Sequence, residues 1–315
     1  MHAFHADTVA LQLPPGHRFP MAKYGFLRQA VREQLPEIHL RAAAPAPLES
    51  LLRVHDAAYV HAVMDGSLTP DQQREIGLPW SPATPERSRR SVGATLAAMR
   101  AAWRDGLACN MAGGTHHASA HQGSGFCVFN DVAVATRELQ HQAQLAGCEV
   151  DVAIIDLDVH QGNGTADLFA HDDSVFTLSL HGENNFPFLK AYSDLDVALP
   201  DGCTDAHYLA ALRDALTQLD ARFTPDMVFY LAGADPPEGD RLGRLKLSDA
   251  GMAERDRMVF DWARRRALPM AFAMAGGYGV DLATTVRVQL QTLRIASEMA
   301  RHWPLTKRQT FAVRA

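Results

Sequence analysis

The chain has 315 residues, of which 47% are hydrophobic and 21% are charged, and its formal net charge is −6. This composition is ordinary for a globular protein and sufficient for a large core. The bulk charge does not indicate a nucleic-acid-binding surface, and a mildly acidic surface suits a cationic small molecule or a basic peptide.

Two further features bear on location. No apolar stretch reaches the ~20 residues that a membrane span needs, and the N-terminus Met1-His-Ala-Phe-His lacks a signal-peptide pattern. The four cysteines form no CxxC pair, which indicates a reducing compartment without a disulfide framework. We therefore expect a soluble, cytoplasmic protein with no membrane or nucleic-acid partner.

The first helix whose two ends can be predicted begins at Thr84 and Pro85, which form an N-cap and first-turn pair, and it ends at Gly106. Its basic run, Arg87–Arg90, is expected to be a solvated helix face, as is the later run Arg264–Arg266. Asn130 is expected to cap the next helix, which ends near Gly147 and carries an apolar face of Val132, Val134 and Leu139.

Short, continuously apolar runs alternate with the helices and predict strands that are buried on both faces. These runs are Leu107–Met111, Val152–Leu157, Val175–Leu180, Met227–Ala232 and Met270–Ala275. A helix is predicted after Cys203, with apolar residues at helical spacing at Tyr208, Leu209, Leu212, Leu216 and Leu219. The pattern predicts a single α/β domain over residues 1–315, with a central, mainly parallel sheet flanked by helices on both faces.

Polar clusters follow four of the predicted strands. They are Gly113-Gly-Thr-His-His-Ala118, Asp156-Leu-Asp-Val-His-Gln-Gly-Asn-Gly164, Gly233-Ala-Asp235 and Gly276-Gly-Tyr-Gly279. Functional sites of open α/β sheets form at the carboxyl ends of the strands. We therefore expect these clusters to meet at one edge of the sheet.

Asp158, His160 and Asp235 form a candidate metal site. Asp158 and His160 are two residues apart, so their side chains project the same way from an extended strand end. Carboxylate oxygens and imidazole nitrogens both bind zinc, and three protein ligands leave the open position that is typical of a catalytic site. Acidic groups packed together with Asp156 would also repel one another without a cation.

In combination and order, these motifs resemble the signature of zinc-dependent histone deacetylases. The resemblance runs from Phe4 to Leu290, and the segment Gly123–Asp131 resembles the part of that family that lines the substrate tunnel. Asp156–Gly164 and Glu238–Leu245 look most like the class IV branch and its bacterial relatives. The fold that this implies is the single-domain arginase/deacetylase-like fold.

The resemblance also implies roles for individual residues. Zinc, one ion per chain, would be held by Asp158, His160 and Asp235. His117 would be the general base and acid, and Tyr278 would donate a hydrogen bond to the developing oxyanion. The remaining site residues fall into three groups: positioning partners of the histidines (Asp156 beside His116, and Asn163), residues of the substrate tunnel (Gly125, Phe126, Phe186, Gly276 and Gly277), and a potassium-type monovalent cation site (Asp156, Asp158 and His160 with Ser179 and Leu180).

The implied activity is hydrolysis of an acyl-lysine amide in a protein or peptide. One departure concerns Asn163, where many family members have Asp; a neutral amide would orient His117 without raising its pKa through charge. The alternatives are a small acylated amine as substrate, as in an acetylpolyamine deacetylase, an arginase-like binuclear manganese hydrolase, and a catalytically silent acyl-lysine-binding protein. The acyl chain, with fatty and hydroxylated chains included, and the oligomeric state stay open.

Overall fold

The computed structural model describes residues 1–304 and 313. Its centre is one sheet of eight parallel strands in the order β2-β1-β3-β8-β7-β4-β5-β6. The strands are β1 (His2–His5), β2 (His39–Ala42), β3 (Leu107–Asn110), β4 (Val152–Asp156), β5 (Val175–Gly182), β6 (Leu195–Leu199), β7 (Met227–Leu231) and β8 (Met270–Ala273). The predicted fold class is thereby confirmed.

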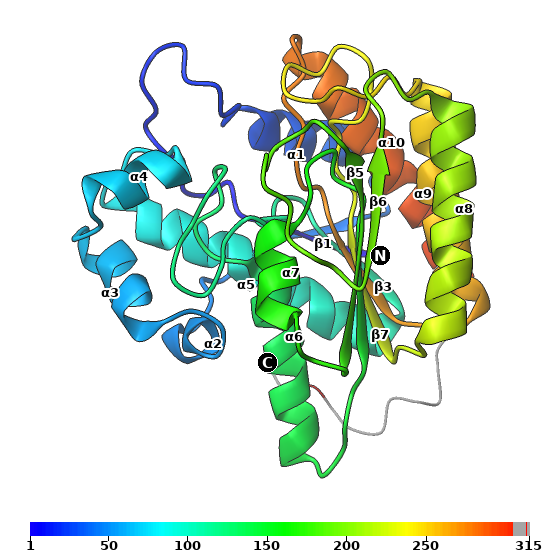
Figure 1. Cartoon of the computed structure of the whole chain (residues 1–315), viewed down its shortest axis with the longest axis horizontal. Coiled ribbons are helices and arrows are strands. Elements are labelled where there is room, and N and C mark those ends of the chain that lie inside the picture. Colours follow the sequence, from blue (N-terminus) through cyan, green and yellow to red (C-terminus); the bar gives the residue numbers. More distant parts are fainter. Residues whose placement is uncertain (305–312, 314–315) are drawn as a thin grey trace.

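Helices cover both faces of this sheet (Figure 1). On one face lie α1 (Lys23–Gln34), α8 (Asp205–Arg222), α9 (Asp249–Arg265) and α10 (Leu282–Ala300). The other face is covered by α2 (Leu48–Leu52), α3 (Ala57–Asp65), α4 (Pro70–Ile76), α5 (Ala83–Asp105), α6 (Asp131–Leu145) and α7 (Asn163–Phe169). In the part of the chain that the structure describes, no helix is long and apolar enough to cross a membrane.

The alternation of side chains along the central strands explains the two cores. In β4, Ala153 and Ile155 pack into the core on the α8–α10 side, whereas Val152 and Ile154 pack into the core on the α5–α6 side. Successive side chains of a strand point to opposite faces. A strand that is covered on both faces must therefore be apolar at every position, which is the pattern that the sequence displays.

All five predicted strands are present, with ends that differ by one or two residues. The strands β1, β2 and β6 were not predicted. None of their sequences, HAFH, HLRA and LDVAL, is a continuous apolar run, and β2 and β6 are the two edges of the sheet. An edge strand that is partly exposed has no need of a continuous apolar run.

The structure confirms the predicted helix ends with one exception. Asn130 caps α6, because its side chain accepts a hydrogen bond from the Ala133 N–H, and Gly106 ends α5. The prediction that Thr84 caps α5 is wrong. The helix begins at Ala83, and the Thr84 hydroxyl instead accepts a hydrogen bond from Ser81 N at 2.9 Å.

The prediction that Arg87–Arg90 forms a solvated face is wrong for Arg87. This side chain is only 5% exposed, and its guanidinium lies 4.8 Å from the centre of the Tyr24 ring. The rest of the run is half-buried. A cation of this kind is buried by tertiary contacts from α1, which the local sequence of α5 does not reveal.

A buried ion pair joins the sheet to α9 and α10. Arg255 is fully buried and contacts Asp256 at 2.7 Å, and its Nη1 donates to the carbonyl oxygen of Gly233 at 2.6 Å. Asp256 also accepts hydrogen bonds from the hydroxyls of Tyr230 (2.5 Å) and Thr292 (2.6 Å). Since Gly233 follows β7, this pair holds the loop at the end of that strand.

We expect Arg255→Ala to lower the free energy of unfolding by about 3–5 kcal/mol, because removal of one partner leaves a buried charge uncompensated. Urea denaturation measures this loss. The matched control is Arg257→Ala on the same helix, whose side chain is 53% exposed and whose pairing with Glu254 is loose; such a pair contributes at most ~1 kcal/mol. Equal stabilities of the two variants would contradict a structural role for the buried pair.

Candidate active site

The four polar clusters meet at the carboxyl edge of the sheet, as the sequence predicts. The loop after β4 carries Asp158 and His160, and the loop after the neighbouring strand β7 carries Asp235. The loops after β3 and β8 carry His116–His117 and Tyr278. His116, His117, Asp158, His160 and Tyr278 line one cavity of about 950 Å³.

Asp158, His160 and Asp235 form a buried group whose ligand atoms all lie within 4.8 Å of one another and could hold a metal ion. The His160 Nδ1 lies 2.9 Å from Asp158 Oδ1 and 3.5 Å from Asp235 Oδ2. Burial and the charge of Asp158 raise the pKa of Asp235 to about 7. Burial alone would lower the pKa of His160, but the two carboxylates raise it to about 10.

The surroundings of the carboxylates fit a bound cation. Asp158 accepts a hydrogen bond from Gly276 N at 2.8 Å, and Asp235 accepts one from Val159 N at 3.0 Å. The other oxygen of Asp235, Oδ2, is buried without a hydrogen-bond partner among the described residues. A buried polar atom without a partner is costly, and a metal ion between the three side chains would satisfy it.

Gly276 is a glycine for a steric reason. A Cβ at this position would overlap Asp235 Oδ2 and lie 2.5 Å from Asp158 Oδ2. The loop after β8 therefore passes directly beside the ligand carboxylates. The neighbouring Gly277 has a φ of +134°, and a Cβ there would lie 2.7 Å from the Thr285 side chain.

The two histidines after β3 differ in their partners. His116 Nδ1 lies 2.6 Å from Asp156 Oδ2, and His117 Nδ1 lies 2.7 Å from Asn163 Oδ1. Because an amide oxygen can only accept, His117 must carry its proton on Nδ1, which leaves Nε2 with a free lone pair. Both pairings agree with the sequence-based prediction.

The electrostatic surroundings assign opposite charge states to this pair. Burial opposes the charged form of His116, but Asp156 and Asp158 outweigh it and raise its pKa to about 9. Burial and the positive charges of His116 and His160 hold the pKa of His117 well below its usual range. His117 is therefore a neutral proton acceptor beside a cationic neighbour.

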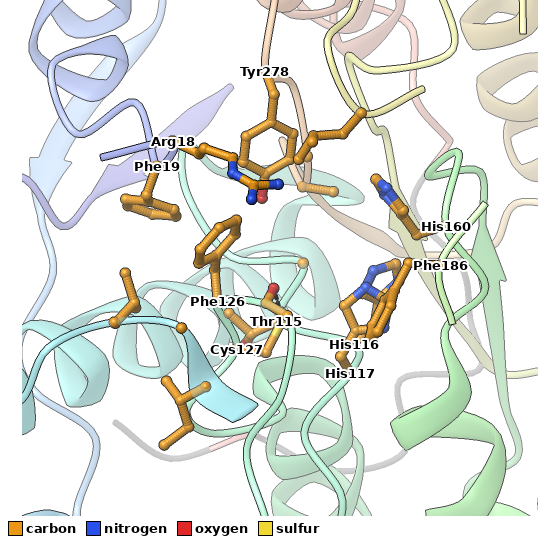
Figure 2. Close-up of a pocket in the computed structure, with 18 of the residues that line it drawn as sticks. Arg18, Phe19, Thr115, His116, His117, Phe126, Cys127, His160, Phe186 and Tyr278 are labelled. Atoms are coloured by element: carbon orange, nitrogen blue, oxygen red, sulfur yellow. Dashed lines mark hydrogen bonds between the residues drawn. The ribbon is translucent and has the colours of Figure 1, made fainter. Parts of the chain in front are cut away.

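Aromatic side chains enclose the cavity around these groups (Figure 2). The ring of Phe186 lies 4.9 Å from the ring of His117, and the ring of Phe126 lies 5.8 Å from that of Tyr278. Gly125 has a φ of +53°, and a Cβ there would lie 2.6 Å from the His117 ring. Four of the five predicted tunnel residues, Gly125, Phe126, Phe186 and Gly276, thus line one cavity, whereas Gly277 is not among its lining residues.

Tyr278 is placed by its backbone. Its N–H donates to Asp240 Oδ2 at 2.6 Å, and its carbonyl oxygen accepts from Arg241 Nε at 2.9 Å. Burial, and after it the charge of Asp158, raises the pKa of the phenol well above its usual range. Tyr278 is therefore protonated and able to donate a hydrogen bond.

Of the residues of the predicted monovalent cation site, Asp156, Ser179 and Leu180 lie on the neighbouring strands β4 and β5, and Asp158 and His160 lie in the loop after β4. Ser179 stands opposite Asp156 in the register of these strands, and Leu180 is buried beside it. The Ser179 hydroxyl lies 3.0 Å from His181 Nδ1.

Sequence reasoning missed two residues that hold the loops of the site and two that line its cavity. Asp131 holds the histidine loop through hydrogen bonds from Gly114 N and Thr115 N at 3.1 and 2.7 Å. Asp240 holds the Tyr278 loop. Lys23 and Arg87 line the cavity from α1 and α5. The acidic residues lie in or beside quoted motifs, but Lys23 and Arg87 carry no local signal, because they reach the site only through tertiary packing.

We expect Gly276→Ala to weaken zinc binding at least about tenfold, because the added methyl group would displace the two carboxylates. Competition titration against a zinc-chelating dye measures the affinity. Gly25→Ala is the control, since Gly25 lies within α1 without a positive φ and a Cβ there would meet only the Asp7 side chain, at 4.0 Å. If both variants bind zinc like the parent chain, the three side chains are not the metal ligands.

Comparisons with known proteins agree with this geometry. The family model for the histone deacetylase domain matches residues 17–293. An uncharacterized protein of Picosynechococcus is 44% identical over 284 residues, which cover 89% of this chain and 92% of that protein. A histone deacetylase-like amidohydrolase of Pseudomonas aeruginosa is 35% identical over 73% of this chain and 63% of its own length.

Histone deacetylase 2 of Arabidopsis thaliana is 36% identical over 65% of this chain, which spans about half (53%) of that protein. Among solved structures, a histone deacetylase homolog from Aquifex aeolicus superposes with a TM-score of 0.79 at 24% identity and covers 94% of this chain and 83% of its own. This likeness confirms the fold. The match of the family model to most of the chain shows that this protein belongs to the histone deacetylase family.

Proposed function

We propose that this protein is a zinc-dependent hydrolase that removes an acyl group from acylated lysine in a protein or peptide. The observation that carries the proposal is the convergence of three elements on one cavity: a three-residue metal centre, a neutral histidine with a free Nε2, and a protonated tyrosine. The names of two relatives, a histone deacetylase and a deacetylase-like amidohydrolase, support it.

Asp158, His160 and Asp235 would hold the zinc ion. When bound, zinc polarises the acyl carbonyl and acidifies water. His117 Nε2 would accept the proton of the attacking water and later return it to the leaving amine. The Tyr278 hydroxyl would donate a hydrogen bond to the oxygen that becomes negative as the carbonyl carbon turns tetrahedral. Asn163 keeps His117 in the tautomer that this role requires.

Asp156 would act on the site in two ways. It fixes His116 at 2.6 Å, and with Ser179 and Leu180 it would hold a monovalent cation such as K⁺. Hard cations prefer oxygen ligands, which the carboxylate, the hydroxyl and the backbone carbonyls of these strands supply. Such a cation would offset part of the negative charge beside the metal centre.

The charges at the mouth of the cavity favour a lysine in a peptide over a polyamine. Arg18 and Arg241 line the cavity, are exposed, and form no ion pair with a described carboxylate. Glu75, also exposed, accepts a hydrogen bond from Ser124. Although the whole chain is acidic, the mouth is basic, so a polycation would be repelled and an acidic peptide attracted.

Hydrolysis of an acetyl-lysine peptide tests this proposal. We expect turnover that a chelator abolishes and zinc restores, and a loss of about 10²–10³ in kcat in Tyr278→Phe, which removes one donor to the oxyanion. Tyr192→Phe is the matched control, since Tyr192 is 90% exposed. Undiminished turnover by Tyr278→Phe would remove the phenol from the mechanism, and faster hydrolysis of acetylspermidine than of the peptide would make a polyamine the substrate.

We also expect Asn163→Asp to shift the acid limb of the pH dependence of kcat/KM to higher pH. A carboxylate 2.7 Å from His117 Nδ1 would favour the imidazolium and raise the pKa of His117. Because His117 must be neutral to accept a proton, activity would then be lost at a higher pH as the solution is acidified. Asn184→Asp adds the same charge to the cavity wall without contacting His117. If the acid limbs of the Asn163 variant and the parent chain superimpose, the charge at this position does not control His117.

A further inference from the structure

Two cations lie buried at the inner end of the cavity. Lys23, at the start of α1, is 1% exposed, and Arg87, in the first turns of α5, is 5% exposed. Both line the same cavity as the metal centre. Both lie close to Tyr24: the Lys23 Nζ is 5.3 Å and the Arg87 Cζ 4.8 Å from the centre of its ring.

Neither cation has an acidic partner. Among residues 1–304 and 313, no carboxylate forms an ion pair with Lys23 or Arg87, and Arg87 Nε is buried without any hydrogen-bond partner. Within the described part of the chain, the Lys23 ammonium has two long hydrogen bonds, of 3.4 Å, to the carbonyl oxygens of Ala275 and Gly277. The charge of Asp7 acts on Arg87 without an ion pair, and the oxygens of Asp7 are engaged by Arg28 and His5.

Buried cations without a counter-charge are destabilising, because the desolvation of each charge is not offset. The negative face of the Tyr24 ring compensates only in part. By contrast, the other fully buried arginine, Arg255, has a carboxylate partner at 2.7 Å. An anion that enters the cavity from solvent would supply the missing charge.

The position of the cations indicates that this anion would belong to the acyl group of the substrate. Lys23 Nζ lies 5.4 Å from the centre of the Tyr278 ring, and its two carbonyl partners flank Gly276, which contacts the ligand carboxylates. The mouth lies at exposed residues such as Arg18 and Arg241, whereas Lys23 and Arg87 are buried. A lysine that enters from the mouth would therefore place its acyl group toward the cations.

We propose that Lys23 and Arg87 bind the terminal carboxylate of the acyl group, so that the preferred substrates are amides of short dicarboxylic acids, such as succinyl-lysine or glutaryl-lysine. This inference rests on the proposed hydrolase function and names its acyl class. Hydrolysis breaks the amide C–N bond: the acyl carbon gains the oxygen of the water and leaves as a dicarboxylate, and the lysine nitrogen takes both hydrogens and leaves as an ammonium group. An uncharged chain of equal length would leave both cations unpaired.

Peptides of one sequence that carry acetyl-, butyryl- or succinyl-lysine test the proposal on the zinc-loaded enzyme. Butyryl and succinyl groups have four carbons each and differ in the terminal carboxylate. We expect kcat/KM for the succinyl peptide to exceed that for the butyryl peptide at least about tenfold, which corresponds to ~1.4 kcal/mol. In Arg87→Met this ratio should fall to one or below, whereas Arg87→Lys, which keeps the charge, should retain part of it.

Arg104→Met is the matched control. Arg104 lies on the same helix, its side chain is 67% exposed, and it pairs with Asp105, so the ratio should not change. A parent enzyme that hydrolyses acetyl-lysine but prefers butyryl to succinyl would overturn the inference and leave the proposed function standing. The inference would also be overturned if acetate bound as tightly as succinate and the enzyme showed no preference for the succinyl peptide. The cations would then bind the released acid and not the acyl group of the substrate.

Calorimetric titration with succinate and with butyrate gives a readout that does not depend on turnover. The parent chain should bind succinate more tightly, and Arg87→Met should lose the difference while its circular dichroism spectrum remains that of the parent chain. If no acylated peptide is hydrolysed but this difference is found, the proposed function fails and the carboxylate site stands. If succinate and butyrate bind alike, the carboxylate site fails.

Discussion

Two carboxylates that share a buried site repel each other, and much of the local structure around Asp158 and Asp235 counters this repulsion. Backbone N–H groups of Gly276 and Val159 donate to them, and His160 lies between them. Gly276 must lack a side chain for its loop to come so close. Burial, and after it the repulsion that remains, raises the pKa of Asp235, and a bound cation would stabilise its charged form.

The same charges shift the pKa values of the two histidines in opposite directions. His116 is held cationic by Asp156 and Asp158, and its positive charge, together with burial, keeps His117 neutral. A site with two adjacent imidazoles in different protonation states can accept a proton at one and stabilise negative charge at the other. Asn163 completes this arrangement, because an amide fixes the tautomer of His117 without adding charge.

The sequence reveals those parts of the fold and site that depend on local patterns. The five strands with continuous apolar sequences, the cap at Asn130 and the four strand-end clusters were predictable from burial, capping and parallel-sheet geometry. The strand β1 was not, because two of its four residues are histidines. Lys23 and Arg87 were not predictable as site residues either, since their burial depends on the packing of α1 against α5 and the Tyr278 loop. Local sequence does not determine where in the fold the charged group of a long cationic side chain lies.

The strands β4 and β7, which lead to the three proposed metal ligands, are neighbours in the interior of the eight-stranded sheet. The edge strand β2 lies several strands from β7, and the edge strand β6 lies two strands from β4. Local opening in proteins begins at edges, termini and loops, and central strands exchange their amide hydrogens only when the whole domain unfolds. Fraying of β2 or β6 would therefore leave the ligand geometry intact. A metal ion at this position would be released through the solvent-connected cavity or by movement of the loops that carry its ligands, and not through fraying of the sheet edges.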